Sequence, residues 1–229
     1  MNDSKANIDI KDIVIIGAGG HAKVVIDIIE RQARYNIIGV IDKSHAKGED
    51  VLGYEILGDE DVLHNMIQEY PSLGGIIAIG DNFIRYKVYE KISISLPEFI
   101  FVSAVHPEAS IGKDVFIGDG TVIMAGATVN TSCSIGRFCI INTNSSLDHD
   151  SVMEDFSSLA PNAVTGGNVK IGEFSAVGIG AVVAHNINIG RHTVIGTAAA
   201  VINDIADYSV AYGVPAEVIR KREKGERYL

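Results

Sequence analysis

The chain has 229 residues, enough for one large domain or two small ones, and 47% of them are hydrophobic without a continuous apolar run that could span a bilayer. Its 19 basic and 29 acidic side chains give a formal charge of -10, which argues against a nucleic acid or an anionic membrane as the main partner. The polar start has no basic region followed by an apolar core, so we expect no secretory signal and no membrane insertion, and we predict a cytoplasmic protein.

The first part of the chain, residues 1–103, alternates β-branched apolar runs with amphipathic segments. Strands are predicted over residues 13–16, 37–41, 75–79 and 98–102. Helical spacing covers residues 21–32, 61–69 and 82–93. Strands that alternate with helices indicate a small parallel sheet of the doubly wound, Rossmann-like kind, so residues 1–103 are predicted to form one α/β domain.

A glycine-rich turn, Gly17-Ala18-Gly19-Gly20, connects the first predicted strand to the first helix. Its unblocked N–H groups at a helix N-terminus offer a seat for a pyrophosphate, which makes Gly19 and Gly20 candidate ligand-binding residues. Asp42 ends the second strand, where an acidic residue can bind a ribose hydroxyl, and Lys43 lies beside it. This pattern alone suggests NAD, but a domain of about ninety residues is too small for both halves of a dinucleotide fold. We therefore expect one nucleotide, as in a UDP- or dTDP-linked sugar.

Three further candidates for this pocket follow the strand at 75–79, namely Gly80, Asn82 and Arg85. Because they come directly after the end of a strand, we expect them to complete the nucleotide-sugar pocket. His21 stands at the start of the first helix. There it either hydrogen-bonds the ligand or caps the helix, and the sequence leaves both roles open.

The sequence from Val105 to Val201 has a period of six. Every sixth residue is aliphatic except Thr165, and the residue four positions later is small or β-branched, a position that includes Cys133 and Cys139. A fixed period without a phase slip indicates a solenoid in which each hexad forms a short strand and a corner. We expect both kinds of residue, the cysteines included, to point inward and three hexads to close one triangular coil. Glycine, which often follows the aliphatic residue, is expected to relieve the backbone bend.

This repeat, with the ending Gly213-Val214-Pro215-Ala216, resembles the hexapeptide-repeat acyltransferases. The order of a small α/β domain followed by the repeat is similar to the sugar acetyltransferases that modify nucleotide-linked 4-amino sugars or sialic acids. The matching motifs are residues 17–21, 79–82 with Arg85, 142–150 and 167–169. The resemblance implies a left-handed parallel β-helix over residues 104–229, a homotrimer, and acetyl-CoA that meets the acceptor in the cleft between neighbouring prisms.

His149 is the candidate general base. It lies two residues after the aliphatic Leu147, so the repeat puts it at a corner with its side chain outward. An amine or hydroxyl that attacks a thioester must lose a proton, and an imidazole that titrates near neutrality is suited to take it. The resemblance assigns Asp150 as the carboxylate that orients His149, and Asp148 on its other side is the alternative. No serine or cysteine nucleophile is needed, because the thioester is already activated.

The acetyl-CoA groove has three candidate residues. Gly167 lies one coil along from His149, so it is a donor of a backbone N–H to the oxyanion, a wall of the groove or a plain corner glycine. The resemblance adds Ser158 and Ile179. The basic side chains available to offset the CoA phosphates are Lys170, Arg191, Arg220, Lys221, Arg222 and Lys224.

These features predict an acetyl-CoA-dependent N-acetyltransferase without a metal, which acetylates the 4-amino group of a nucleotide-linked amino-dideoxy sugar by direct attack. A sialic acid or other sugar O-acetyltransferase is the alternative within the class. A second alternative, from a different class, is a zinc hydratase on the same β-helix. His149 and His185 are two coils apart, roughly 9.6 Å by strand spacing. That distance is too great for them to share one zinc ion with bonds near ~2 Å. A non-catalytic nucleotide-binding scaffold is the third, and it predicts that His149→Ala changes no activity.

Overall fold

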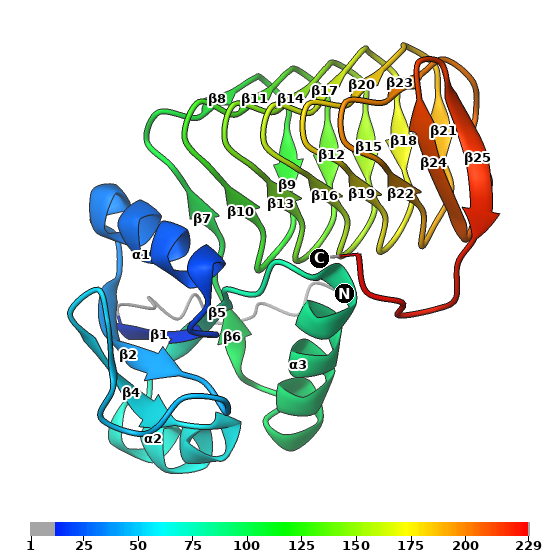
Figure 1. Cartoon of the computed structure of the whole chain (residues 1–229). Coiled ribbons are helices and arrows are strands. Elements are labelled where there is room, and N and C mark those ends of the chain that lie inside the picture. Colours follow the sequence, from blue (N-terminus) through cyan, green and yellow to red (C-terminus); the bar gives the residue numbers. More distant parts are fainter. Residues whose placement is uncertain (1–11, 229) are drawn as a thin grey trace, which may run out of the picture.

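The structure, a computed structural model, describes residues 12–228 and contains a small α/β domain followed by a long prism of stacked coils (Figure 1). The two parts lie side by side, and the last described residues run back from the far end of the prism to the α/β domain. Within residues 12–228, no helix is long and apolar enough to cross a membrane.

The α/β domain is built on a six-stranded sheet in the order β3-β4-β2-β1-β5-β6, in which every neighbouring pair except β3 and β4 is parallel. This confirms the predicted Rossmann-like sheet. The strands are β1 (Asp12–Ile16), β2 (Asn36–Ile41), β3 (Asp50–Val51), β4 (Tyr54–Gly58), β5 (Gly74–Ile77) and β6 (Ile100–Phe101). The helices are α1 (Gly20–Gln32), α2 (Leu63–Glu69), which follows a 3-10 turn at Glu60–Val62, and α3 (Asn82–Ser95).

The hairpin of β3 and β4 was not predicted. Its two-residue turn, Leu52-Gly53, has positive φ at both positions, the geometry of a tight hairpin. Leucine at the first position hides the usual Asn-Gly or Asp-Gly signal. The hairpin adds β4 next to β2 and so widens the sheet on the side away from the prism.

The prism is a left-handed parallel β-helix with three faces, named here after their first strands. Each two-residue strand pairs in parallel with the strand one coil on, as Ile123 does with Ile141, 141 − 123 = 18 residues later, which confirms three hexads per coil. The β7 sheet contains β7 (Ala104–Val105), β10 (Val122–Ile123), β13 (Ile140–Ile141), β16 (Ser158–Leu159), β19 (Ala176–Val177) and β22 (Val194–Ile195), then β24 (Ser209–Gly213) and β25 (Ala216–Lys221).

The other two faces are continuous with it through the corners. The β8 sheet contains β8 (Ser110–Ile111), β11 (Thr128–Val129), β14 (Ser146–Leu147), β17 (Val164–Thr165), β20 (Val182–Val183) and β23 (Ala200–Val201). The β9 sheet contains β9 (Phe116–Ile117), β12 (Ser134–Ile135), β15 (Val152–Met153), β18 (Lys170–Ile171) and β21 (Asn188–Ile189).

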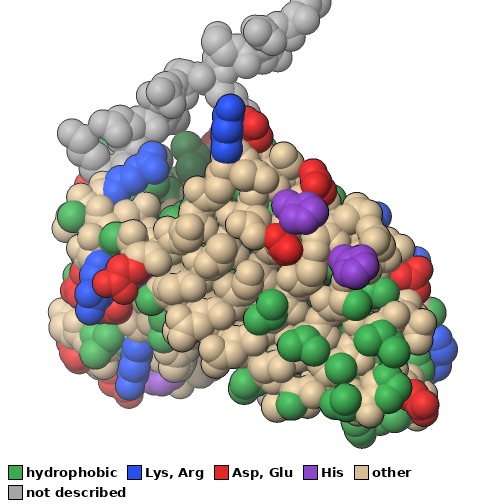
Figure 2. Space-filling view, turned by 90° about the horizontal axis from the view of Figure 1, so that it is seen from above, with side chains coloured by type: hydrophobic (Ala, Val, Ile, Leu, Met, Phe, Trp, Pro, Cys, Tyr) green, Lys and Arg blue, Asp and Glu red, His purple; other side chains and the backbone are tan. Residues whose placement is uncertain are grey.

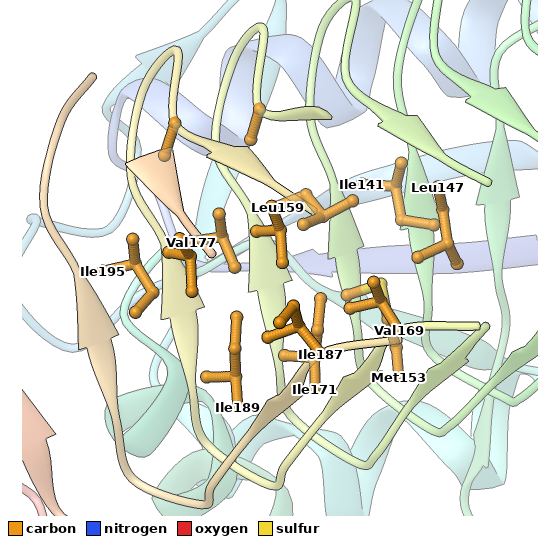
Figure 3. Packing of buried hydrophobic residues seen from close by; sticks show 14 of the residues in the cluster. Ile141, Leu147, Met153, Leu159, Val169, Ile171, Val177, Ile187, Ile189 and Ile195 are labelled. Carbon is orange, nitrogen blue, oxygen red and sulfur yellow. The ribbon is translucent and has the colours of Figure 1, made fainter. Parts of the chain in front are cut away.

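The predicted inward positions form the core of the prism. Leu159, Val177 and Ile195 follow one another at coil spacing along one inner wall (Figure 3). Both free cysteines are buried, as predicted, and burial raises the pKa of the Cys139 thiol to about 11. The pattern weakens only at the open first coils, where Ile111 is 37% exposed because no coil covers it.

The glycine prediction for the corners is wrong. Every sixth residue from Asp114 to Ala198 has a positive φ, so the bend lies two positions after the repeated glycines. Gly118, one of those glycines, has no positive φ, but a Cβ there would lie 2.6 Å from the carbonyl carbon of Gly136 in the next coil. These glycines therefore allow successive coils to approach, while the bend itself falls on residues such as Asp150.

Aromatic packing joins the two parts of the chain. Phe138, Phe156 and Phe174 stack along one edge of the prism, with ring centroids 5.0 and 5.5 Å apart. From α3, Tyr86 packs edge-on against Phe156 at 5.4 Å, and Tyr89 lies 4.6 Å from Phe138. The helix therefore fixes the α/β domain beside the β7 sheet.

Candidate active site

His149 lies at the edge of the prism between β14 and β15, and its side chain is 57% exposed. Leu147 and Ser151 on either side are fully buried, which confirms the predicted outward corner. The imidazole Nδ1 lies 2.8 Å from Oδ2 of Asp150, and this hydrogen bond, with the charge of Asp148, raises the pKa of His149. An acceptor on Nδ1 favours the tautomer in which Nε2 carries the lone pair. The arrangement offers a base that points away from the prism.

Asp148 is occupied elsewhere. Its Oδ1 accepts hydrogen bonds from Nδ2 of Asn130 at 2.6 Å and from the backbone N–H of His149 at 2.8 Å, and these bonds lower the pKa of Asp148. Of the two carboxylates considered from the sequence, the one that contacts the imidazole is Asp150. Asp148 holds the backbone of the corner.

Gly167 lies under the imidazole of His149. A Cβ added at Gly167 would be 2.5 Å from both Cε1 and Nε2 of the ring, far inside van der Waals contact. The neighbouring residue Asn168 donates its backbone N–H to the carbonyl of His149 at 2.8 Å, which ties the two coils together. The absent side chain of Gly167 therefore leaves the space that the ring occupies.

A cavity of about 300 Å³ lies between the α/β domain and the β7 sheet. It brings together residues that were predicted for two different ligands. His21 and Gly80, predicted for the nucleotide sugar, line it from the α/β domain, and Ser158 and Ile179, predicted for acetyl-CoA, line it from the prism. Tyr228 completes its lining. Tyr228 was not predicted, because the basic side chains are the only signal that the sequence of the tail offers.

His21 belongs to this cavity and does not cap its helix. The N-cap of α1 is Gly19, with no side-chain hydrogen bond. Within residues 12–228, Nε2 of His21 is buried without a hydrogen-bond partner. Burial, with the nearby charge of Arg85, lowers the pKa of His21 to about 4, so the ring is neutral near pH 7. A neutral imidazole with a free nitrogen is available to a ligand in the cavity.

The glycine turn at the start of α1 is open on its ligand side. Gly19 and Gly20 are exposed, and a Cβ at either would meet nothing within 4 Å. Asp42 lies against the turn, because its Oδ2 accepts the backbone N–H of Ala18 at 2.9 Å. Its Oδ1 accepts the N–H of Ser44 and contacts Nδ1 of His45. Burial acts to raise the pKa of Asp42, but the hydrogen bonds from His45, Ser44 and Ala18 outweigh it, so this pKa is lowered. Lys43 beside it is exposed.

Within one chain, His149 and the cavity lie on different sides of the prism. The cavity is lined from the β7 sheet, by strands such as β16 and β19. His149 follows a strand of the β8 sheet and precedes one of the β9 sheet. In a three-sided prism the edge between those two sheets is opposite the β7 sheet, so the base does not reach the cavity of its own chain.

Comparisons with known proteins agree with this architecture. Residues 12–92 match the family described as the PglD N-terminal domain. The chain is 30% identical over 165 residues to GDP-perosamine N-acetyltransferase of Escherichia coli O157:H7, covering 69% of this chain and 71% of that protein. The chain belongs to this family of sugar N-acetyltransferases. It is also 35% identical over 116 residues to UDP-N-acetylbacillosamine N-acetyltransferase of Bacillus subtilis, a match that spans 50% of this chain and 52% of that protein.

Solved structures of family members extend over nearly the whole chain. The GDP-perosamine N-acetyltransferase of Caulobacter crescentus, with one histidine replaced by alanine and in complex with CoA and GDP-perosamine, is 35% identical with a TM-score of 0.86, covering 93% of this chain and 98% of that one. The acetyltransferase domain of PglB from Neisseria gonorrhoeae, in complex with acetyl coenzyme A, is 30% identical with a TM-score of 0.85, covering 91% and 99%. The predicted family, and with it the class of acetyl-CoA-dependent sugar acetyltransferases, is confirmed.

Two of the predicted substrate-binding residues, Asn82 and Arg85, have buried side chains that bond to other parts of the chain. Asn82 is 0% and Arg85 is 1% exposed. The guanidinium of Arg85 donates to the carbonyl oxygens of Ile79, Gly80 and Phe138 and to Oδ1 of Asn82, at 2.6 to 3.0 Å. Asn82 in turn donates to the hydroxyl of Ser158 at 3.1 Å. In this structure both side chains join α3 to the prism, and their contact with substrate stays a prediction.

The basic side chains expected to offset the CoA phosphates are mostly paired. Lys170 contacts Glu154, Arg191 contacts Asp207 and Arg220 contacts Glu226, all within 3.2 Å. Arg222 is buried and donates to the carbonyl of Glu226. No group of three or more His, Cys, Asp or Glu side chains within residues 12–228 is placed to hold a metal ion.

Proposed function

We propose that this protein transfers the acetyl group of acetyl-CoA to the 4-amino group of a nucleotide-linked 4-amino-4,6-dideoxy sugar. The observation that carries the proposal is the imidazole of His149, exposed over Gly167 with Nδ1 on Asp150, in a chain 35% identical to a GDP-perosamine N-acetyltransferase. That relative was also solved with one histidine replaced by alanine or asparagine and with CoA and GDP-perosamine bound.

The proposed reaction is a direct transfer. The lone pair of the sugar amine attacks the thioester carbon, a C–N bond forms, and the carbonyl π electrons move onto the oxygen. Nε2 of His149 takes the proton that the nitrogen loses, and Asp150 stabilises the imidazolium that results. Collapse of the oxyanion breaks the C–S bond, and His149 returns its proton to the departing CoA thiolate. The backbone N–H of Gly167, beside the ring, is our candidate donor to the oxyanion.

The acceptor is proposed to bind to the α/β domain. Its diphosphate would lie on the open N–H groups of Gly19 and Gly20, with Asp42 and Lys43 near the nucleoside. The sugar would extend past His21 and Gly80 into the cavity. Acetyl-CoA would approach along the prism, beside Ser158 and Ile179.

A site of this kind needs two subunits, because His149 and the cavity lie on different sides of one chain. We propose the homotrimer that the family resemblance implies, with the His149 edge of one subunit against the cavity of the next. An exposed apolar surface supports this contact: Val164 and Val182 are neighbours on the β8 sheet, and Ile179 lies close in sequence at the adjoining corner. Figure 2 looks onto this side and shows hydrophobic side chains gathered toward the end of the prism away from the α/β domain.

The test is release of the CoA thiol from acetyl-CoA with a panel of UDP-, dTDP- and GDP-linked 4-amino sugars. We expect turnover with at least one of them, and a loss of roughly 100-fold or more in turnover for His149→Ala, the usual effect of a general base. His64→Ala removes an exposed histidine from α2 and is the matched control. Turnover only with sialic acids would replace the proposal by O-acetylation, and an unchanged rate for His149→Ala would refute the base.

A further inference from the structure

The C-terminal segment 222–228 forms a strap between the two parts of the protein. After β25 it turns back from the end of the prism and reaches α3 (Figure 1). The backbone N–H of Arg222 donates to the carbonyl of Tyr208 at 2.9 Å on the prism side. Gly225 has a positive φ and lies so close to the ring of Phe83 on α3 that a Cβ would be 2.4 Å from it. The strap is therefore seated against both parts.

The strap ends with Tyr228 in the cavity. The Tyr228 hydroxyl accepts the backbone N–H of Asn82 at 3.2 Å, at the start of α3. Burial raises the pKa of this phenol, so it is neutral near pH 7. The guanidinium carbon of Arg222 lies over the Tyr228 ring, 5.7 Å from its centre. The hydroxyl is thus anchored, and the ring lines the cavity together with His21 and Gly80.

We propose that Tyr228 is a specificity-determining residue that binds the sugar ring of the acceptor, an inference that rests on the proposed function. The contact with Asn82 N places Tyr228 at the α3 end of the cavity, beside Gly80, where the acceptor is assigned. A cavity of about 300 Å³ is at the small end of ligand sites, so it fits one sugar ring and not a whole nucleotide sugar. The apolar face of a dideoxy sugar, with its methyl group, is suited to an aromatic ring.

The experiment compares two ligands that differ only in the sugar. Calorimetry measures the binding of a nucleoside diphosphate and of the corresponding nucleotide-linked 4-amino sugar to each variant. Tyr228→Ala is expected to weaken binding of the nucleotide sugar roughly tenfold, the effect of one lost ring contact, and to leave the nucleoside diphosphate within about twofold. Tyr228→Phe keeps the ring and should keep the preference. Arg227→Ala, an exposed neighbour, is the control.

Three results would overturn the proposal. They are an equal loss of affinity for both ligands, a change confined to the KM of acetyl-CoA, and a loss of nucleotide-sugar affinity in Tyr228→Phe as large as in Tyr228→Ala. Thermal unfolding of each variant shows whether the fold is kept, and Tyr228→Trp, which narrows the cavity, is expected to reduce nucleotide-sugar binding in the same selective way. If the unaltered protein binds nucleotide sugars but transfers no acetyl group, the proposed function fails while Tyr228 is still tested by binding. If it binds none of them, both fail.

Discussion

Gly167→Ala is predicted to impair the proposed chemistry without altering the core. The added Cβ would lie 2.5 Å from Cε1 and Nε2 of His149, whereas ordinary contact begins near 3.4 Å, so the ring must move by 3.4 − 2.5 = 0.9 Å. Gly167 has no positive φ, so alanine can take its backbone conformation. A displacement of about 1 Å at a reacting group can cost roughly 100-fold in rate. We therefore expect kcat to fall by about that factor, with little change in the melting temperature.

The assay is thiol release from acetyl-CoA with the accepted nucleotide sugar, in four proteins: the unaltered chain, Gly167→Ala, His149→Ala and the double variant. If Gly167→Ala acts by displacing the imidazole, it should have little further effect on kcat in the His149→Ala protein. The losses of kcat in the two single variants are then not additive in the double variant. Gly166→Ala is the matched control for a general disturbance of the corner, because its Cβ would meet the backbone of His185 at 2.8 Å and not the ring of His149. Full additivity, or a kcat within about threefold for Gly167→Ala, would refute the reasoning.

Two further substitutions test other parts of the structure. Asp150→Asn weakens the hydrogen bond that raises the pKa of His149, so we expect that pKa to fall. Because the base must be neutral, the acidic limb of the pH profile of kcat/KM moves to lower pH and its plateau drops. An acidic limb that does not move would contradict this prediction. Arg85→Leu leaves the carbonyls of Ile79 and Phe138 without their hydrogen-bond donor. We expect it to lower the free energy of unfolding, measured by urea titration, by about 3 kcal/mol. The control is Lys87→Ala, at an exposed position on the same helix, which should change that free energy by under about 0.5 kcal/mol. A loss below about 1 kcal/mol for Arg85→Leu would argue against its joining role.

The prism could be predicted from the sequence because its period is strict. In a solenoid each coil contacts its neighbours in the same way, so one register fixes the burial of every position, including the outward place of His149. The α/β domain was predicted with its main strands for a similar local reason. The β3–β4 hairpin was missed because Leu52 takes a positive φ that its type gives no reason to expect.

The contacts between the two parts could not be predicted from local signals. Polar residues after a strand end are typical of a ligand site, and the same pattern describes Asn82 and Arg85, which hold the domains together. Only the tertiary position of α3 beside Phe138 distinguishes the two roles. Tyr228, in contrast, was not predicted although it lines the cavity. No sequence motif surrounds it, and its position in the cavity depends on the path of the whole strap.

The register of the hexad repeat also bears on how subunits assemble. Residues that differ by 18 lie on the same edge of the prism, as His149 and Gly167 do, since 167 − 149 = 18. Ile179 differs from His149 by 179 − 149 = 30, which is one coil of 18 plus two hexads, so it must lie on a different edge, and the structure has it in the cavity instead. Residues expected to bind one acetyl-CoA molecule are thus divided between two edges by the period itself. A single prism cannot bring those edges together, because its core lies between them, but two prisms packed edge to face can. The repeat that builds the fold therefore favours a site shared between subunits.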